Sequence, residues 1–191
     1  LSHGMILEAQ RSLTSAGQFT FSVMDAQNLN FSNGIFDAVV ANHMLYHVPN
    51  LPRTLQEIQR VLKPGGKVFA ATNGVDHLTE IFQLADSLPV AELIPSFKSG
   101  YAKPTRQFSL ENGSELLQRY FSGISLFPYL DSLRVTEAEP LTDYLLSLFA
   151  DRLPRQEYFP MINAAVEHVI ANSPGRILHI TKSTGLFSAT K

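Results

Sequence analysis

The residues of this chain that could do chemistry follow short apolar runs, where strands would end. Asp25 comes just after residues 19–23, and Asn42 and His43 come just after residues 36–41. Ligands of open α/β sheets bind beyond the carboxyl ends of the strands. We therefore expect these polar side chains to face a ligand site.

A second pair of candidates, Tyr46 and His47, comes shortly after Asn42. A histidine near its unperturbed pKa of about 6.5 can act as a general base at neutral pH. The turn from Leu45 to Val48 could instead only pack this loop against the helix that follows. The residues leave both interpretations of His47 open.

The elements that must position these residues alternate between strand and helix. Residues 19–23 alternate apolar and polar side chains, which predicts a strand, and residues 36–41 are typical of a short buried strand. An amphipathic helix is predicted over 50–63, capped by Asn50, and another strand over 68–72. Glu57, on this helix, is expected on its exposed face, as is Glu8 near the start of the chain. This alternation predicts an α/β fold with a parallel sheet.

Further elements are predicted on both sides of this core. Ser2 would cap a helix ending before Gly17, and Asp76 would cap a helix reaching Ala85. The rest are a helix at 116–121, a strand at 124–135 interrupted at Pro128, helices at 137–149 and 156–171, and a hairpin of 176–181 with 186–189 around Ser183-Thr184-Gly185.

The composition limits the class of protein. The chain has 191 residues, enough for one domain with its own core. Its net charge of −2 gives no basic surface for nucleic acid, and it has no cysteine for a disulfide or a thiolate metal site. No apolar run reaches the roughly 18–20 residues that span a bilayer. These features favour a cytoplasmic protein with no nucleic-acid, membrane or metal partner.

Four motifs, in this order, carry a family resemblance. They are L-S-H-G-M-I-L-E-A at 1–9, D-A-Q-N-L-N-F at 25–31, F-D-A-V-V-A-N-H-M-L-Y-H-V at 36–48 and L-x-E-I-x-R-V-L-K-P-G-G-x-V at 55–68. Together they resemble the class I S-adenosylmethionine-dependent methyltransferases, above all the group that methylates small molecules. The strong match covers residues 1–74. The C-terminal half is similar only through F-S-L-E-N-G at 108–113 and G-L-F-S-A-T-K at 185–191.

The resemblance implies a fold and a division of the chain. A single methyltransferase-like domain would span 1–191, with a Rossmann-like, mostly parallel sheet, helices on both faces and an antiparallel C-terminal hairpin. Residues 1–74 would form the cofactor-binding core, and about 75–122 a lid that shapes the substrate pocket. The cofactor would be S-adenosylmethionine and the partner a small-molecule substrate, with no oligomeric state implied.

The resemblance also assigns roles to single residues on the adenine side. The Asp25 carboxylate would accept a hydrogen bond from the adenine amino group, and the Ala26 backbone N–H would donate to a ring nitrogen. Such a pair complements an amino donor beside a ring acceptor. Gln27 would lie at the adenine rim and Met5 would pack against the adenine or ribose. The simpler alternatives are an Asp25 that caps a turn and a Met5 that faces a helix core.

The remaining assignments concern the methyl group. Asn42 and His43 would line the cofactor where backbone carbonyls face its amino group and sulfonium. Tyr46 and His47 would lie near the channel for methyl transfer, on the substrate side. A sulfonium methyl is already electrophilic, so positioning and desolvation supply much of the rate, and no universal catalytic residue is implied.

The chain departs from the family pattern in one respect. The Gly-rich loop of the first strand (acidic-x-G-x-G-x-G) and the acidic residue that closes the second strand do not occur in it. We expect that these segments precede Leu1 in a longer protein, and that residues 1–191 alone are not a competent enzyme. The alternative is a non-catalytic relative, a binding or partner subunit that lost the cofactor loop.

Overall fold

The computed structural model describes residues 3–13, 19–88, 107–148 and 153–191. Its helices are α1 (His3–Ser12), α2 (Leu51–Val61), α3 (Thr79–Ser87), α6 (Gly113–Gln118), α7 (Ala138–Ser147) and α8 (Arg155–Asn172), with short 3-10 helices η1 (Leu45–His47) and η2 (Pro174–Arg176). Its strands are β1 (Phe36–Asn42), β2 (Leu62–Asn73), β3 (Ser122–Val135) and β4 (Leu178–Thr190).

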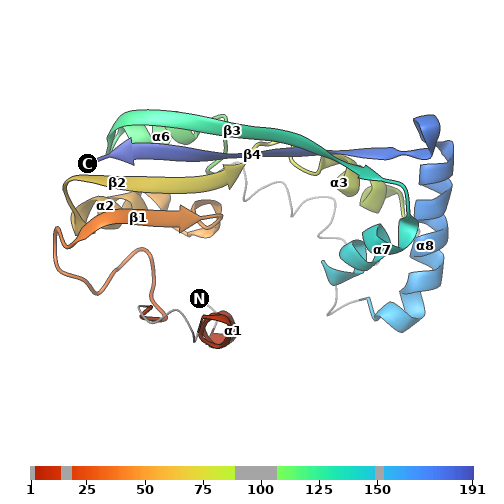
Figure 1. The fold of residues 1–191 in the computed structure, drawn as a ribbon, viewed down its shortest axis with the longest axis horizontal. Helices are drawn as coiled ribbons and strands as arrows, with labels where there is room; N and C mark the ends of the chain where they lie inside the picture. Colours follow the sequence, from red (N-terminus) through yellow and green to blue (C-terminus); the bar gives the residue numbers. More distant parts are fainter. Residues whose placement is uncertain (1–2, 14–18, 89–106, 149–152) are drawn as a thin grey trace.

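The four strands form one mixed sheet in the order β1-β2-β4-β3 (Figure 1). β1 and β2 are parallel, whereas β4 runs antiparallel to both β2 and β3. The α/β class and the antiparallel C-terminal strand are confirmed. Because two of the three pairings are antiparallel, the described part of the sheet is mixed rather than mostly parallel.

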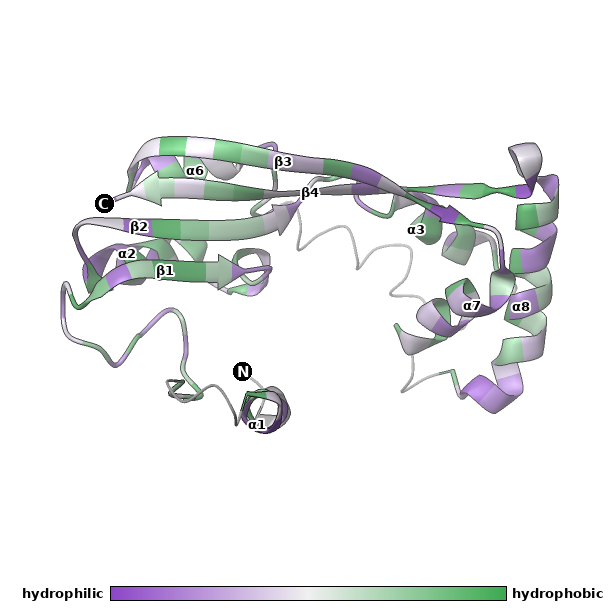
Figure 2. Ribbon diagram, viewed as in Figure 1, coloured by the Kyte–Doolittle hydropathy of each residue, from purple (hydrophilic) through white to green (hydrophobic). Residues whose placement is uncertain are grey.

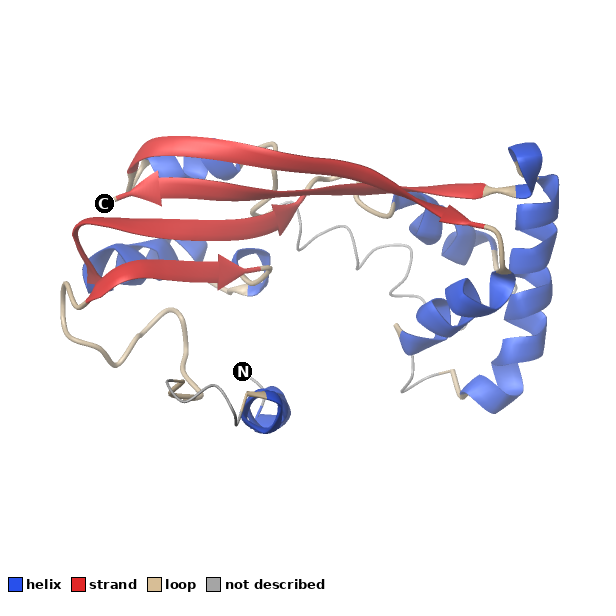
Figure 3. Ribbon diagram, in the orientation of Figure 1, coloured by secondary structure: helices blue, strands red, loops and turns tan. Residues whose placement is uncertain are grey.

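Helices α2 and α6 pack on one face of this sheet (Figure 3). Their contacts form a first core, in which Leu55 of α2 and Leu117 of α6 meet Val68 of β2 and Phe187 of β4. The opposite face carries no helix among the described residues. There Val40 is 69% exposed and Phe127 is 58% exposed. Helices on both faces, as the resemblance implies, are therefore not seen in the described ranges.

A second core lies at the other end of β4, where α3, α7 and α8 meet (Figure 1). Ile180 of β4 is fully buried there against residues such as Leu145 and Val166. β4 therefore contributes to both cores, through Phe187 in the first and Ile180 in the second. None of the helices within the described ranges is long and apolar enough to cross a membrane.

α2 is the element that follows most directly from the sequence. The Asn50 carboxamide oxygen accepts a hydrogen bond from the Arg53 N–H (3.0 Å), which confirms the predicted cap. The helix ends at Val61 and β2 begins at Leu62, so the predicted helix over 50–63 is too long at its C-terminus and the predicted strand over 68–72 begins too late. Hydrophobic residues are continuous over Ala38–Ala41 of β1 and Val68–Ala71 of β2, which lie side by side in the sheet (Figure 2).

The strand predicted over 19–23 is wrong. This segment has no regular structure, and Phe19 and Val23 are 58% and 40% exposed. Alternating side chains make a strand only where a neighbouring strand satisfies the backbone N–H and C=O groups. No strand among the described residues pairs with this segment.

The hairpin predicted around Ser183 is also wrong in its position. β4 runs without a turn from Leu178 to Thr190, and its partner is β3, which continues through Pro128 without interruption. Pro128 is tolerated because β3 is an edge strand.

Two further helix predictions concern the N-termini. Asp76 does not cap α3, whose N-cap is Leu78 in a left-handed conformation without a side-chain hydrogen bond. Asp76 instead accepts hydrogen bonds from Thr79 through its backbone carbonyl. The predicted cap Ser2 lies outside the described residues.

Candidate functional site

Asp25 lies in a tight turn at the start of the site. The Asn28 N–H donates to the Asp25 carbonyl oxygen (3.0 Å), which closes a turn with Ala26 and Gln27 at its centre. The Asp25 carboxylate is exposed and accepts hydrogen bonds from the Gln27 backbone N–H (2.9 Å) and carboxamide (3.1 Å). The Gln27 backbone N–H, followed by its side chain, holds the pKa of the Asp25 carboxyl below its usual value. Asp25 is therefore a charged acceptor.

The Ala26 N–H and the Asp25 carboxylate together suit a purine edge. Within the described part of the chain the Ala26 N–H has no hydrogen-bond acceptor. A carboxylate offers about four lone-pair sites, so Asp25 retains the capacity to accept from a ligand amino group. These two groups therefore fit the adenine contacts assigned to them, and they do so from a turn rather than from a strand end.

Asn42 and His43 lie where β1 leaves the sheet, as predicted. Asn42 is exposed, and it pairs with Ala71 of β2. His43 has a left-handed backbone (φ 48°), and its N–H donates to the Ala71 carbonyl oxygen (3.1 Å). Few non-glycine residues have a positive φ of this kind, and those that do are concentrated at functional sites.

Tyr46 and His47 occupy η1, directly after β1. Leu45 is fully buried, Tyr46 is half-buried and His47 is exposed. The Tyr46 ring lies 4.4 Å from the His47 ring and 6.4 Å from the His43 ring, between ring centres. Burial raises the pKa of the Tyr46 hydroxyl, so it stays protonated at neutral pH. Leu45 packs η1 against the first core, and His47 faces solvent.

Two residues to which the sequence assigned no role complete this end of the sheet, one at the end of β2 and one just after it. Asn73 is the last residue of β2, and its buried carboxamide oxygen has no hydrogen-bond partner. His77 follows in the next turn, where its Nδ1 accepts a hydrogen bond from the Ser183 N–H (3.1 Å). The signal that could have found Asn73 is the one used for Asn42, a polar residue at the carboxyl end of a parallel strand.

The two histidines at this end are held in the neutral form. Desolvation of part of its ring lowers the pKa of His43. Burial, followed by repulsion from His43 and Lys182, lowers the pKa of His77. Neutral imidazoles do not repel a cation, so a positively charged ligand group meets no opposing charge from them.

Part of the predicted lid crosses the same end of the sheet. The Gln107 carboxamide donates to the Val48 carbonyl oxygen (2.7 Å), and the Leu110 N–H donates to the Asn73 carbonyl oxygen (3.2 Å). Phe108, between them, is fully buried, and its carbonyl oxygen accepts from the Thr72 hydroxyl (2.8 Å). This segment is therefore bonded to the carboxyl end of β2 and to Val48, the residue after η1.

Glu57 is buried, contrary to the prediction of an exposed helical face. It is 4% exposed, and its carboxylate pairs with Arg60 and accepts from the Leu29 N–H. The Arg60 guanidinium, followed by the Leu29 N–H and by Arg53, lowers the pKa of Glu57 to about 2 against the cost of burial. A helical wheel could not show this, because the loop that covers Glu57 is irregular. Glu8, by contrast, is 72% exposed, as predicted.

The structure brings together most, but not all, of the predicted site residues. Ala26, Met44 and Tyr46 all pack on the first core, so the Asp25 turn and the end of β1 share one packed support. Met5 lies on α1, which contributes no described residue to either core. The Met5 side chain is outside what the structure describes, and its predicted contact stays a prediction.

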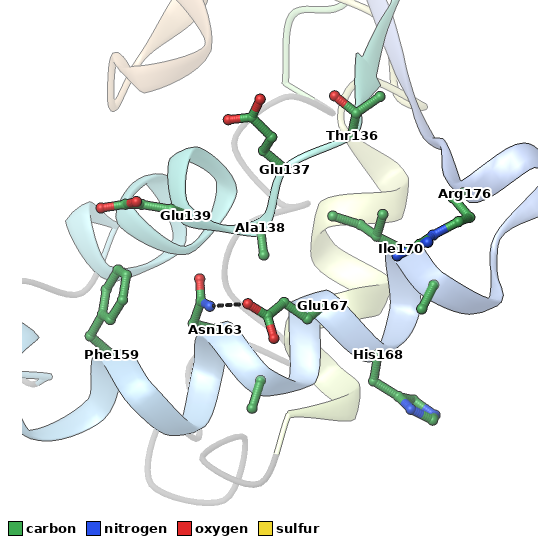
Figure 4. A pocket seen from close by; sticks show the side chains of 12 residues that line it. Thr136, Glu137, Ala138, Glu139, Phe159, Asn163, Glu167, His168, Ile170 and Arg176 are labelled. Carbon is green, nitrogen blue, oxygen red and sulfur yellow. Dashed lines mark hydrogen bonds between the residues drawn. The ribbon is translucent and has the colours of Figure 1, made fainter.

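A separate cavity of about 740 Å³ lies between α7 and α8 (Figure 4). Carboxylates of Glu137, Glu139 and Glu167 line it, and Glu167 accepts a hydrogen bond from Asn163 (2.8 Å). None of the predicted site residues lines this cavity. It belongs to the second core, at the opposite end of β4 from the first (Figure 1).

Comparison with known proteins connects the first part of the chain to methyltransferases. Residues 1–70 match the family profile described as a methyltransferase domain. This segment contains the Asp25 turn, the end of β1 and η1. The resemblance to the class I S-adenosylmethionine-dependent methyltransferases is confirmed by this match and by the similarities that follow.

The chain is similar to a ubiquinone biosynthesis O-methyltransferase of Xanthomonas oryzae, at 28% identity over 65% of this chain and 54% of that protein. It therefore spans about half the length of this relative. In fold it resembles a presumed methyltransferase of Bacillus halodurans, with a TM-score of 0.61 and 15% identity over 100% of this chain and 80% of the other. It also resembles the phosphoethanolamine N-methyltransferase 2 of Haemonchus contortus in complex with S-adenosyl-L-methionine, with a TM-score of 0.54 and 21% identity over 100% of this chain and 42% of the other.

Proposed function

We propose that the protein is a methyltransferase that uses S-adenosylmethionine to methylate an oxygen or nitrogen of a small molecule. The observation that carries this proposal is the Asp25 turn, whose exposed carboxylate and Ala26 N–H, without an acceptor among the described residues, are complementary to adenine. The turn lies within the segment that matches the methyltransferase family. The relative from Xanthomonas oryzae, named for ubiquinone biosynthesis, supports a small acceptor with a hydroxyl group.

Each group has a proposed role. When bound, S-adenosylmethionine supplies an electrophilic methyl group. Asp25 and Ala26 fix the orientation of the purine, and Gln27 contacts its rim. Asn42 and His43 line the sulfonium side, where the neutral state of His43 avoids repulsion. Met5 contributes an apolar contact to the adenine or ribose.

The acceptor would lie beside Tyr46 and His47, near the contacts that Gln107 and Phe108 make with this end of the sheet. The Asn73 carboxamide oxygen, buried and unpaired, would accept a hydrogen bond from the acceptor hydroxyl or amino group. A buried polar group without a partner is costly, which favours a ligand partner here. Positioning and exclusion of water would then supply much of the rate.

The first prediction concerns Asp25. The full-length protein should bind S-adenosylhomocysteine, and Asp25→Ala should weaken that binding roughly tenfold or more, because the ligand amino group loses a charged acceptor. Isothermal titration calorimetry measures both affinities. Asp37→Ala is the matched control, since Asp37 is an exposed carboxylate paired with Lys63 away from the turn.

The outcomes separate the two classes of function. Binding that is lost in Asp25→Ala and kept in Asp37→Ala supports the cofactor site. If the wild-type protein shows no affinity for S-adenosylhomocysteine, the alternative gains, namely a non-catalytic relative that serves as a binding or partner subunit. Equal affinity in all three proteins would exclude Asp25 from the site.

A further inference from the structure

The loop from Gln27 to Ile35 makes several hydrogen bonds with α2, besides local bonds within the loop. The Leu29 N–H donates to Oε2 of Glu57 (2.9 Å), and the Leu29 carbonyl oxygen accepts from Nη2 of Arg60 (2.8 Å). A single residue of the loop is thus bonded on both sides by one ion pair. The ion pair therefore satisfies both the N–H and the C=O group of Leu29, as a neighbouring strand would in a sheet.

Further contacts extend this arrangement in both directions. Nη1 of Arg60 donates to the Phe31 carbonyl oxygen (2.7 Å) and to the Asn33 side chain (2.8 Å). Nε of Arg53, two turns before Arg60 on α2, donates to the Gln27 carbonyl oxygen (3.2 Å). Because Gln27 is part of the Asp25–Asn28 turn, this last bond ties the turn itself to the helix.

The geometry of the ion pair is specific. Nε and Nη2 of Arg60 donate to the two oxygens of Glu57 at 3.0 Å and 2.9 Å, a bidentate arrangement. The Glu57 side chain is 5% exposed, so the pair is shielded from water on the carboxylate side. A buried pair of this kind costs desolvation and is weak evidence of stabilisation by itself. Its contacts with the loop indicate a role in placing that loop.

We propose that Arg53, Glu57 and Arg60 are positioning residues that hold the Asp25–Asn28 turn in the geometry that selects adenine over other purines. This inference rests on the proposed function. Asp25 and Ala26 would form the hydrogen bonds with the purine. Their relative positions depend on the hydrogen bonds that fix Gln27 and Leu29 to α2. Through this placement, the motif L-x-E-I-x-R of α2 would influence which purine binds without contacting the ligand itself.

The test compares S-adenosylhomocysteine with S-inosylhomocysteine, in which a carbonyl oxygen replaces the adenine amino group and the neighbouring ring nitrogen carries a hydrogen. The wild-type protein should prefer the adenine compound about tenfold or more, because both contacts are reversed in the inosine compound. Glu57→Gln should reduce this ratio at least about fivefold. A glutamine NH2 group at either oxygen position would face a donor of Arg60 or Leu29.

One control variant and a second test variant separate positioning from general destabilisation. Glu115→Gln alters an exposed i,i+4 pair with Arg119 on α6 and should leave the ratio unchanged. Arg53→Met removes the donor to Gln27 and a 3.7 Å contact with Glu57 from a side chain that is 52% exposed. It keeps both hydrogen bonds between Arg60 and Glu57 and should lower the ratio. If Glu57→Gln fails to fold in thermal unfolding, Arg53→Met decides the question.

The outcomes are distinct. A reduced ratio in Arg53→Met or Glu57→Gln, with Glu115→Gln like the wild type, supports the proposal. Folded variants that bind both compounds more weakly by the same factor overturn it, since a merely structural role leaves the ratio unchanged. A wild type that binds S-adenosylhomocysteine without preferring it to the inosine compound also overturns it. A wild type that binds neither compound rejects the proposed function itself.

Discussion

At the scale of single residues, the polar side chains beyond β1 and β2 define the candidate site. Asn42 and His43 could be predicted, because a polar pair after a short apolar run marks the carboxyl end of a strand. Glu57 could not be predicted as buried, since the loop that covers it has no periodicity. The orphaned carboxamide of Asn73 is likewise a property of the packing and not of any motif.

We expect Asn73→Leu to raise the free energy of unfolding by about 1 kcal/mol. The substitution keeps a similar volume and removes a buried acceptor that has no partner, whose desolvation costs about 1–3 kcal/mol. Urea denaturation of the wild type and the variant measures the change. Asn42→Leu is the control, because Asn42 is exposed and should show little gain. A loss of stability in Asn73→Leu would mean that the carboxamide has a partner after all.

At the scale of elements, local signals decided which predictions succeeded. The cap of α2 and the apolar residues of its buried face are encoded within the segment itself. The burial of Glu57 and the end of the helix at Val61 are not. The strand over 19–23 failed because its existence depends on a partner strand, which lies outside the segment. Ser183-Thr184-Gly185 has the composition of a turn and so predicts a hairpin, whereas pairing with β3 keeps β4 continuous through these residues.

The contact between α6 and β4 provides a test at this scale. A Cβ atom added at Gly113 would lie 2.5 Å from Cε2 of Phe187, whose ring is fully buried. Gly113→Ala should therefore lower the free energy of unfolding by about 1–3 kcal/mol, as overpacking of a core does. Chemical denaturation measures it, with Ser114→Ala on the same helix as the control. Unchanged stability in Gly113→Ala would show that Phe187 moves aside freely.

At the scale of the whole molecule, one sheet supports two separate cores. The methyltransferase-like core contains α2, α6 and the ends of β1 and β2, and the second contains α3, α7 and α8. The α/β class could be predicted from the alternation of elements along the chain. The division into two cores could not, because it depends on how far β3 and β4 extend beyond β2.

The titration of His43 and His77 predicts how stability depends on pH. Burial lowers the pKa of each below its unfolded value of about 6.5, so the unfolded chain binds more protons in this range. The free energy of unfolding should therefore be highest above about pH 7 and fall as the pH drops through 6.5. Urea denaturation at pH 7.5 and 5.5 measures the loss, which should shrink in the double variant His43→Asn, His77→Asn.

His179→Asn, at an exposed position of β4, serves as the control and should keep the wild-type dependence on pH. A second decrease in the free energy of unfolding is expected at lower pH from Glu57, because its pKa of about 2 is below the ordinary value of 4.5. Its contribution is present above pH 4.5 and disappears as the pH falls toward 2. A profile that is flat between pH 7.5 and 5.5 would contradict the role of the histidines.

The register of β3 and β4 has one more consequence. Their last pair joins Val135 to Leu178, so the chain leaves the sheet and returns to it at the same place. Residues 136–177, which include α7 and α8, are in effect the insert of a single long hairpin. Evolution can lengthen, shorten or exchange such an insert without shifting the register of the strands that hold the methyltransferase-like core.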